Sequence, residues 1–159
     1  MKTLIIYFSR NGSTKKAALA LAEKLSAHVE EVGPVERYDG ILGYFRAAID
    51  SLRGNLPAID PIEQSPRNLE LIVVAAPLWA GHAATPIRTY LSNHKGEFRK
   101  IASLITRGGS SADQAFAEIR QLSGLQPVAE LSLRDKEIKA GSFTEQVSGF
   151  GDAIKRELK

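Results

Sequence analysis

Short runs of apolar residues alternate along this chain with longer segments of helical periodicity, and this alternation limits the folds open to it. The run Leu71–Ala76 is apolar throughout, which is typical of a strand buried on both faces of a parallel sheet. The predicted strands are 4–8, 28–32, 69–76, 101–106 and 127–133. The predicted helices, with apolar residues at spacings of three and four, are 13–27, 41–53, 85–91, 111–122 and 143–158. Strands and helices in this order predict repeated β-α-β units.

These units are expected to assemble into a doubly wound α/β fold, with a parallel sheet between two layers of helices in a three-layer α/β/α arrangement. Five strands are too few for an eight-stranded barrel. With 159 residues the chain is long enough for one compact core and too short for two ordinary ones. We therefore expect one domain over residues 1–159.

Two prolines are expected to mark the ends of elements. Pro77 directly follows the third apolar run and is expected to end that strand. Thr85 and Pro86 precede the next helical segment, which predicts Thr85 as the N-cap and Pro86 as the first helical residue.

The composition excludes several kinds of chemistry. The chain has no cysteine, which removes disulfides, Cys-based zinc or iron–sulfur sites and thiol catalysis. No run approaches the ~20 apolar residues of a membrane helix, so we expect a cytoplasmic protein without a membrane partner. The net charge of +3 arises from basic residues interleaved with acidic ones, so no nucleic-acid partner is expected. A redox function would therefore need a bound cofactor.

Polar loops rich in Gly, Ser and Thr follow three of the predicted strands. In an open doubly wound sheet, ligands bind at the carboxyl ends of the strands, where the strand order reverses. The loops after the first, third and fourth strands are therefore expected to form one site. These loops are Ser9-Arg10-Asn11-Gly12-Ser13-Thr14, Pro77-Leu78-Trp79-Ala80-Gly81-His82 and Thr106-Arg107-Gly108-Gly109-Ser110-Ser111.

The first loop leads directly into the N-terminus of a predicted helix, where free N–H groups and the helix dipole favour a phosphate group. A helix cap needs one hydroxyl, whereas this loop offers Ser9, Ser13 and Thr14, so both a phosphate site and a simple cap remain open here. The dinucleotide pattern G-x-G-x-x-G and the triphosphate loop ending in Gly-Lys-Ser/Thr are absent, which favours a mononucleotide. The acidic residues that a phospho-receiver needs after its first and third strands are also absent.

The segment from Tyr7 to Ala18 resembles the flavin phosphate loop of the flavodoxin family. The family pattern is Ser/Thr-x-Thr-Gly-Asn-Thr, and this chain has Asn11 for the inner Thr and Ser13 for Asn, both of them polar. The segment 77–91 is similar to the family's Pro-x-Trp-x-Gly…Pro-(Val/Ile)-x-x-Phe-Leu segment, and 106–110 is similar to its Thr-x-Gly-Gly-x turn. The resemblance spans nearly the whole chain.

This resemblance implies a sheet order of 2-1-3-4-5, for which flavodoxin is a standard example, and a noncovalently bound FMN. It also implies electron transfer with redox partner proteins. The implied FMN-binding residues are Ser9, Arg10, Asn11, Gly12, Ser13, Thr14, Pro77, Leu78, Trp79, Ala80, Gly81, Thr106, Arg107, Gly108, Gly109 and Ser110. No catalytic acid, base or nucleophile and no metal site is expected, because the flavin carries the electron chemistry.

Individual roles follow from the same resemblance. Trp79 is expected to stack on the flavin ring, and the Ala80-Gly81 peptide is expected to face flavin N5 and to reorient when the flavin is reduced. Arg107 either raises the reduction potential by stabilising the anionic reduced flavin or points to solvent. His82, which has no metal-ligating neighbour in sequence, is expected to have only a surface role.

Two other functions remain open at this point. One is an NAD(P)H-dependent FMN or quinone reductase, and the other is a regulatory or binding module with weak or no flavin binding. The stretch 33–67 is also open to more than one interpretation, because its helix at 41–53 is consistent with a lid over the flavin, a docking surface for a reductase, or an ordinary sheet-covering helix.

Overall fold

The computed structural model describes residues 2–35 and 40–159. The strands are β1 (Thr3–Tyr7), β2 (His28–Glu31), β3 (Leu71–Trp79), β4 (His82–Ala83), β5 (Ile101–Arg107) and β6 (Glu130–Arg134). The helices are α1 (Ser13–Leu25), α2 (Gly40–Arg53), α3 (Thr85–Asn93), α4 (Asp113–Ser123), α5 (Asp135–Ala140) and α6 (Thr144–Glu157), with a 3-10 turn, η1, at Pro66–Asn68.

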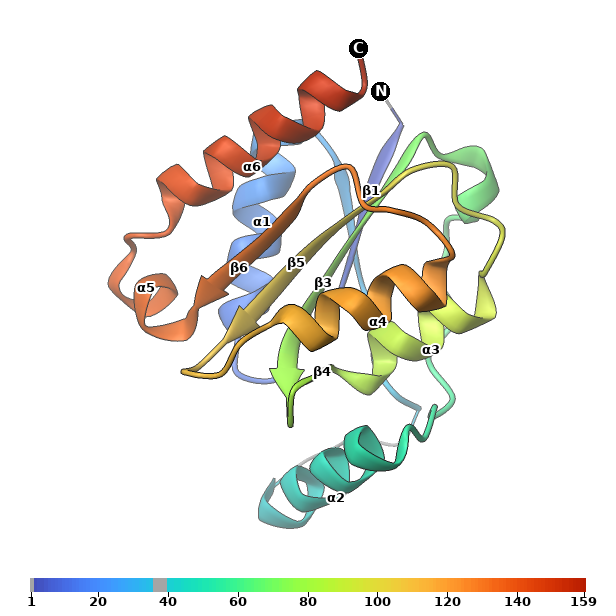
Figure 1. The fold of residues 1–159 in the computed structure, drawn as a ribbon, viewed down its shortest axis with the longest axis vertical. Coiled ribbons are helices and arrows are strands. Elements are labelled where there is room, and N and C mark those ends of the chain that lie inside the picture. The colour runs from blue at the N-terminus through green and yellow to red at the C-terminus, as the bar shows by residue number, and fades with distance from the viewer. Residues whose placement is uncertain (1, 36–39) are drawn as a thin grey trace.

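The sheet has the strand order β2-β1-β3-β5-β6, and every pair in this series is parallel. Counted without the two-residue β4, this is the predicted order 2-1-3-4-5, so the predicted fold class is confirmed. β1 is the second strand in the row and β3 lies at the centre. The carboxyl ends of the parallel strands lie at one edge of the sheet, the lower edge in Figure 1.

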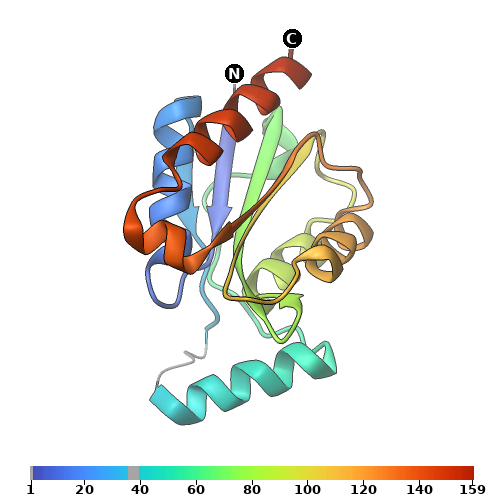
Figure 2. The ribbon, with the colours of Figure 1, turned by 60° about the vertical axis from the view of Figure 1, so that its left-hand side comes forward.

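Helices cover both faces of the sheet, with α3 and α4 on one face and α1, α5 and α6 on the other (Figures 1 and 2). Alternate residues of β3 supply the two cores. Ile72, Val74 and Ala76 belong to the cluster beneath α3 and α4, whereas Leu71 and Val73 belong to the cluster beneath α1 and α6. The strand is apolar throughout because both of its faces are buried.

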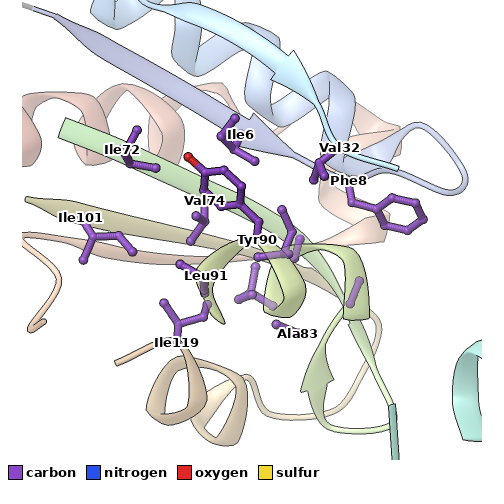
Figure 3. Close-up of a cluster of buried hydrophobic side chains, with 14 of the residues drawn as sticks. Ile6, Phe8, Val32, Ile72, Val74, Ala83, Tyr90, Leu91, Ile101 and Ile119 are labelled. Atoms are coloured by element: carbon purple, nitrogen blue, oxygen red, sulfur yellow. The ribbon is translucent and has the colours of Figure 1, made fainter. Parts of the chain in front are cut away.

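Tyr90 occupies the centre of the cluster beneath α3 and α4, next to Val74 and Leu91 (Figure 3). Its side chain is fully buried, and this burial, followed by the charges of Glu30 and Glu97, raises the pKa of its hydroxyl. The phenol is therefore neutral wherever the fold is intact at ordinary pH.

The structure corrects three details of the sequence-based prediction. Pro77 does not end its strand, because β3 continues to Trp79 and Pro77 is in register with Thr106 of β5. The last residue of β3 paired with β1 is Ala75, so at Pro77 one neighbouring strand has already ended and a proline is tolerated. The N-cap of α3 is Ala84 rather than Thr85, which is the first helical residue. The helix α5 was not predicted.

The helix α2 is present with nearly the predicted bounds, but it does not cover a face of the sheet. It lies across the carboxyl edge, outside the layers (cyan in Figures 1 and 2), so the interpretation as an ordinary sheet-covering helix is wrong. Several of its apolar side chains are exposed, among them Ile41 at 78% and Leu42 at 84%. Residues 36–39, in the same predicted connection, lie outside the described residues.

Candidate functional site

The loops after β1 and β5 meet at the carboxyl edge of the sheet. The hydroxyl oxygens of Thr14, in the first turn of α1, and Thr106, near the end of β5, are 2.7 Å apart in a buried hydrogen bond. Arg10 connects the first loop to α2 by donating to the Gly40 carbonyl oxygen at 3.1 Å. Two of the three loops predicted to form one site are therefore joined directly, and α2 lies at their rim.

The first loop turns sharply at Gly12, the N-cap of α1, which has a φ of 92°. Two of its side chains are bonded within the loop: the Gly12 N–H donates to the Ser9 hydroxyl and the Ser13 N–H donates to the Asn11 side-chain oxygen, both at 3.1 Å. The N–H groups of Thr14 and Lys15 have no acceptor within residues 2–35 and 40–159. These free donors, at the positive end of a 13-residue helix, suit a phosphate group.

The second loop is a two-residue β-hairpin between β3 and β4. Trp79 and His82 are its closing pair, and both turn residues have positive φ, 49° at Ala80 and 85° at Gly81. A hairpin of this kind requires the left-handed region at both positions, which glycine adopts freely and alanine does not. The Trp79 ring packs edge-on against Phe8, with ring centroids 5.2 Å apart. The hairpin therefore presents a partly exposed indole beside the first loop.

The third loop is anchored through Arg107, whose guanidinium is turned toward β6. It donates from Nε to the Ser132 hydroxyl and from a terminal nitrogen to the Ser110 carbonyl oxygen at 3.1 Å. A side chain placed at Gly108 or Gly109 would meet nothing within 4 Å, so the surface of the loop is open at this point. An approaching ligand reaches the backbone here without obstruction.

A cluster of charged side chains lies behind the hairpin and escaped the sequence analysis. Glu118 of α4 accepts from His82 at 3.1 Å and pairs with Arg88 of α3 at 3.0 Å. The Arg88 and Glu118 side chains are only 8% and 16% exposed. The prediction that His82 has only a surface role is therefore wrong, because the cluster attaches the hairpin to two helices.

A sequence signal for this cluster exists but is weak. Glu118 directly precedes the buried Ile119, and Arg88 directly follows the buried Ile87, so both charges border the apolar stripes of their helices. Helical periodicity shows that such positions are near the core, but not that two of them face each other. In the described part of the chain, no group of three His, Cys, Asp or Glu side chains is arranged to hold a metal ion.

The comparisons with known proteins agree with this geometry. The family model described as Flavodoxin matches residues 2–147. The chain belongs to the flavodoxin family. The predicted family is therefore confirmed over most of the sequence. No match was found among proteins of curated function.

Solved structures similar to this flavodoxin-family chain include a flavoprotein from Lactobacillus acidophilus in complex with FMN. It is 28% identical, with a TM-score of 0.73, and the match covers 89% of this chain and 98% of that one. A candidate flavoprotein from Bacteroides uniformis is 24% identical, with a TM-score of 0.78 and coverage of 93% and 96%. Oxidised flavodoxin 2 from Bacillus cereus is 16% identical, with a TM-score of 0.61 and coverage of 99% of each chain. The last two matches concern the fold alone.

The hydrogen bond between Thr14 and Thr106 gives a first testable prediction for this flavodoxin-family site. In the apoprotein, Thr106→Val is expected to lower the free energy of unfolding by about 1–3 kcal/mol, because the buried Thr14 hydroxyl loses its partner. Urea denaturation measures the change.

Ser103→Ala is the matched control, since Ser103 lies on the same strand and is equally buried, but its hydroxyl has no partner within the described residues. That variant is expected to retain nearly the full stability. Equal losses in Thr106→Val and Ser103→Ala would show that the two loops are not held together by this bond.

Proposed function

We propose that this chain binds FMN noncovalently and uses it for electron transfer. The observation that carries the proposal is the pair of unbonded N–H groups at Thr14 and Lys15, placed where α1 begins at the carboxyl edge of the sheet. The crystallised complex of the similar Lactobacillus acidophilus flavoprotein with FMN supports the choice of ligand. The bound flavin supplies the electron chemistry.

The first loop holds the phosphate group in this proposal. Gly12 allows the turn that aims the N–H groups of Thr14 and Lys15 outward, and Ser9 and Asn11 fix that turn by accepting hydrogen bonds from backbone donors. The N-terminal end of α1 adds its positive dipole, which favours a dianionic phosphate. The loop is therefore organised before a ligand arrives.

The hairpin and the third loop hold the ring system in this proposal. Trp79, backed by Phe8, offers an aromatic wall against which a planar ring packs. The hairpin peptide Ala80-Gly81 and the open backbone at Gly108-Gly109 present hydrogen-bonding groups to the ring edge. The complete set of FMN-binding residues proposed is the one given by the resemblance, in 9–14, 77–81 and 106–110.

A redox partner protein has to approach this same edge of the sheet. The helix α2 lies there, joined to the first loop by Arg10, and exposes the apolar side chains of Ile41, Leu42 and Phe45. Exposed apolar surface of this kind marks interaction sites. We therefore place the partner's docking surface on α2 rather than on the helices that cover the sheet. In the described part of the chain, no helix is long and apolar enough to span a membrane.

The test is a titration of the apoprotein with FMN and, in parallel, with riboflavin, which lacks the phosphate group. Binding is followed by the quenching of flavin fluorescence. FMN is expected to bind saturably and riboflavin at least ~10-fold more weakly, because riboflavin has no phosphate group to accept hydrogen bonds from the first loop. Equal affinities would refute the phosphate loop, and no binding of either flavin would refute the function. Steady oxidation of NADPH by the FMN-loaded protein alone would show that the protein is a reductase and not an electron carrier.

A further inference from the structure

A cavity of about 340 Å³ lies at the carboxyl edge between β5, β6 and α4. Its lining residues are Arg107, Gly109, Ser111, Ala112, Asp113, Phe116, Ser132 and Arg134. They come from the end of β5, the loop between β5 and α4, the first turn of α4 and the end of β6. None of these lining residues belongs to the loops after β1 and β3, so the cavity lies beside the proposed flavin site and shares only the third loop with it.

Two arginines on neighbouring strands line this cavity. Arg107 and Arg134 are paired in register on the neighbouring strands β5 and β6, and both line the cavity. Like charges on directly paired strand positions destabilise a sheet. Neither guanidinium forms an ion pair with a carboxylate of residues 2–35 and 40–159, although Asp113 also lines the cavity. The cavity is thus lined by two arginines and one aspartate, and no ion pair among the described residues holds either guanidinium.

The rest of the lining defines what kind of anion fits. Arg107 is fixed in place by its bonds to Ser132 and to the Ser110 carbonyl oxygen, which leaves further N–H donors available. Ser111 and Ser132 add hydroxyls, while Phe116 and Ala112 add an apolar surface. The volume lies at the lower end of the ~300–1,000 Å³ typical of small-molecule sites. A small molecule with an oxyanion at one end therefore matches this lining.

We propose that this cavity binds the carboxylate or phosphate group of a small organic molecule between Arg107 and Arg134. Arginine recognises both oxyanions with paired hydrogen bonds, and an anion between the two guanidinium groups offsets their repulsion. The proposal goes beyond FMN binding and does not rest on it, because Asp113, Ser132 and Arg134 lie outside the loops proposed to hold FMN. A ligand held there lies next to the loop proposed to hold the flavin ring.

The experiment titrates the ¹⁵N-labelled protein, once as apoprotein and once loaded with FMN, with benzoate in one series and inorganic phosphate in another. Ionic strength is held constant, and the amide signals of Gly109, Ser111 and Ser132 are followed by NMR. We expect saturable shifts with at least one probe in both forms of the protein. The series that saturates identifies the headgroup that the cavity prefers.

Arg134→Gln is expected to weaken this binding at least ~10-fold, because it removes a charged hydrogen-bond donor while leaving the first and second loops unchanged. Arg99→Gln is the matched control, since Arg99 is also exposed but lies two residues before β5, at the opposite edge of the sheet. It is expected to leave the binding unchanged. Thermal unfolding of both variants establishes that they fold.

Three results would overturn the proposal. The first is the absence of saturation with both probes. The second is an equal loss in Arg134→Gln and Arg99→Gln, which would assign the shifts to the overall charge. The third is displacement of the probe by FMN, which would make the cavity a part of the flavin site. Saturation in an apoprotein that fails to bind FMN would support the cavity and refute the proposed function, so the two are tested separately.

Discussion

Replacing Gly12 with valine is expected to weaken FMN binding at least ~10-fold, provided that the first loop holds the phosphate group. Gly12 has a φ of 92°, a conformation that a β-branched residue adopts only at a cost of about 1–3 kcal/mol. The backbone at residue 12 is expected to rotate to relieve this strain. The N–H groups of Thr14 and Lys15 then no longer point at the proposed phosphate position. Fluorescence titration of the variant apoprotein with FMN measures the loss.

Gly96→Val separates this effect from a general loss of stability. Gly96 has a φ of 84° and open space around it, as Gly12 does, but it lies between α3 and β5 at the opposite edge of the sheet. The two variants are expected to lose similar unfolding free energy, and only Gly12→Val is expected to lose affinity for FMN. If both variants bind FMN equally well, the backbone at Gly12 does not form the phosphate site.

The sheet was predictable because its strands are buried on both faces. A run such as Leu71–Ala76 has to be apolar at every position in a central parallel strand, and few other elements give so short and continuous a run. The meeting of the first and third loops was predictable for a topological reason, since carboxyl ends of parallel strands share an edge. The bond between Thr14 and Thr106 is the local consequence of that rule.

The position of α2 was not predictable from its periodicity. An apolar stripe shows that a helix forms and that one face avoids water, but it does not say which surface covers that face. In this chain Ile41 and Leu42 stay largely exposed, and the helix crosses the edge of the sheet instead. The hairpin at Trp79–His82 was missed for a different reason, because Pro77 suggested the end of the strand and Ala80 is an unusual residue for positive φ.

Contacts between charged residues that are far apart in the sequence were also not predictable. The register that places Arg107 beside Arg134 depends on how two strands align, and a shift of one residue would separate the two side chains. In the same way, Arg88 and Glu118 meet only because α3 and α4 pack on the same face of the sheet. Tertiary packing determines which residues form each pair, so neither pair can be identified before the fold is known.

Arg88→Met is expected to lower the free energy of unfolding by about 3 kcal/mol, because it leaves the mostly buried Glu118 carboxylate without its arginine. Methionine retains most of the apolar stem, so the loss of packing is small. Urea denaturation measures the change. Arg67→Met is the control, since Arg67 pairs with Glu97 at the same 3.0 Å but is 72% exposed, and exposed pairs contribute less than about 1 kcal/mol.

The double variant Arg88→Met/Glu118→Leu distinguishes an unpaired buried charge from a loss of packing. When both charges are removed, most of the stability is expected to return, because an apolar pair of similar size replaces a buried ion pair at little cost. A double variant less stable than Arg88→Met would contradict this account and would assign the main role to the bond between Glu118 and His82. In that case the cluster acts chiefly on the hairpin that carries Trp79, and FMN affinity would fall together with stability.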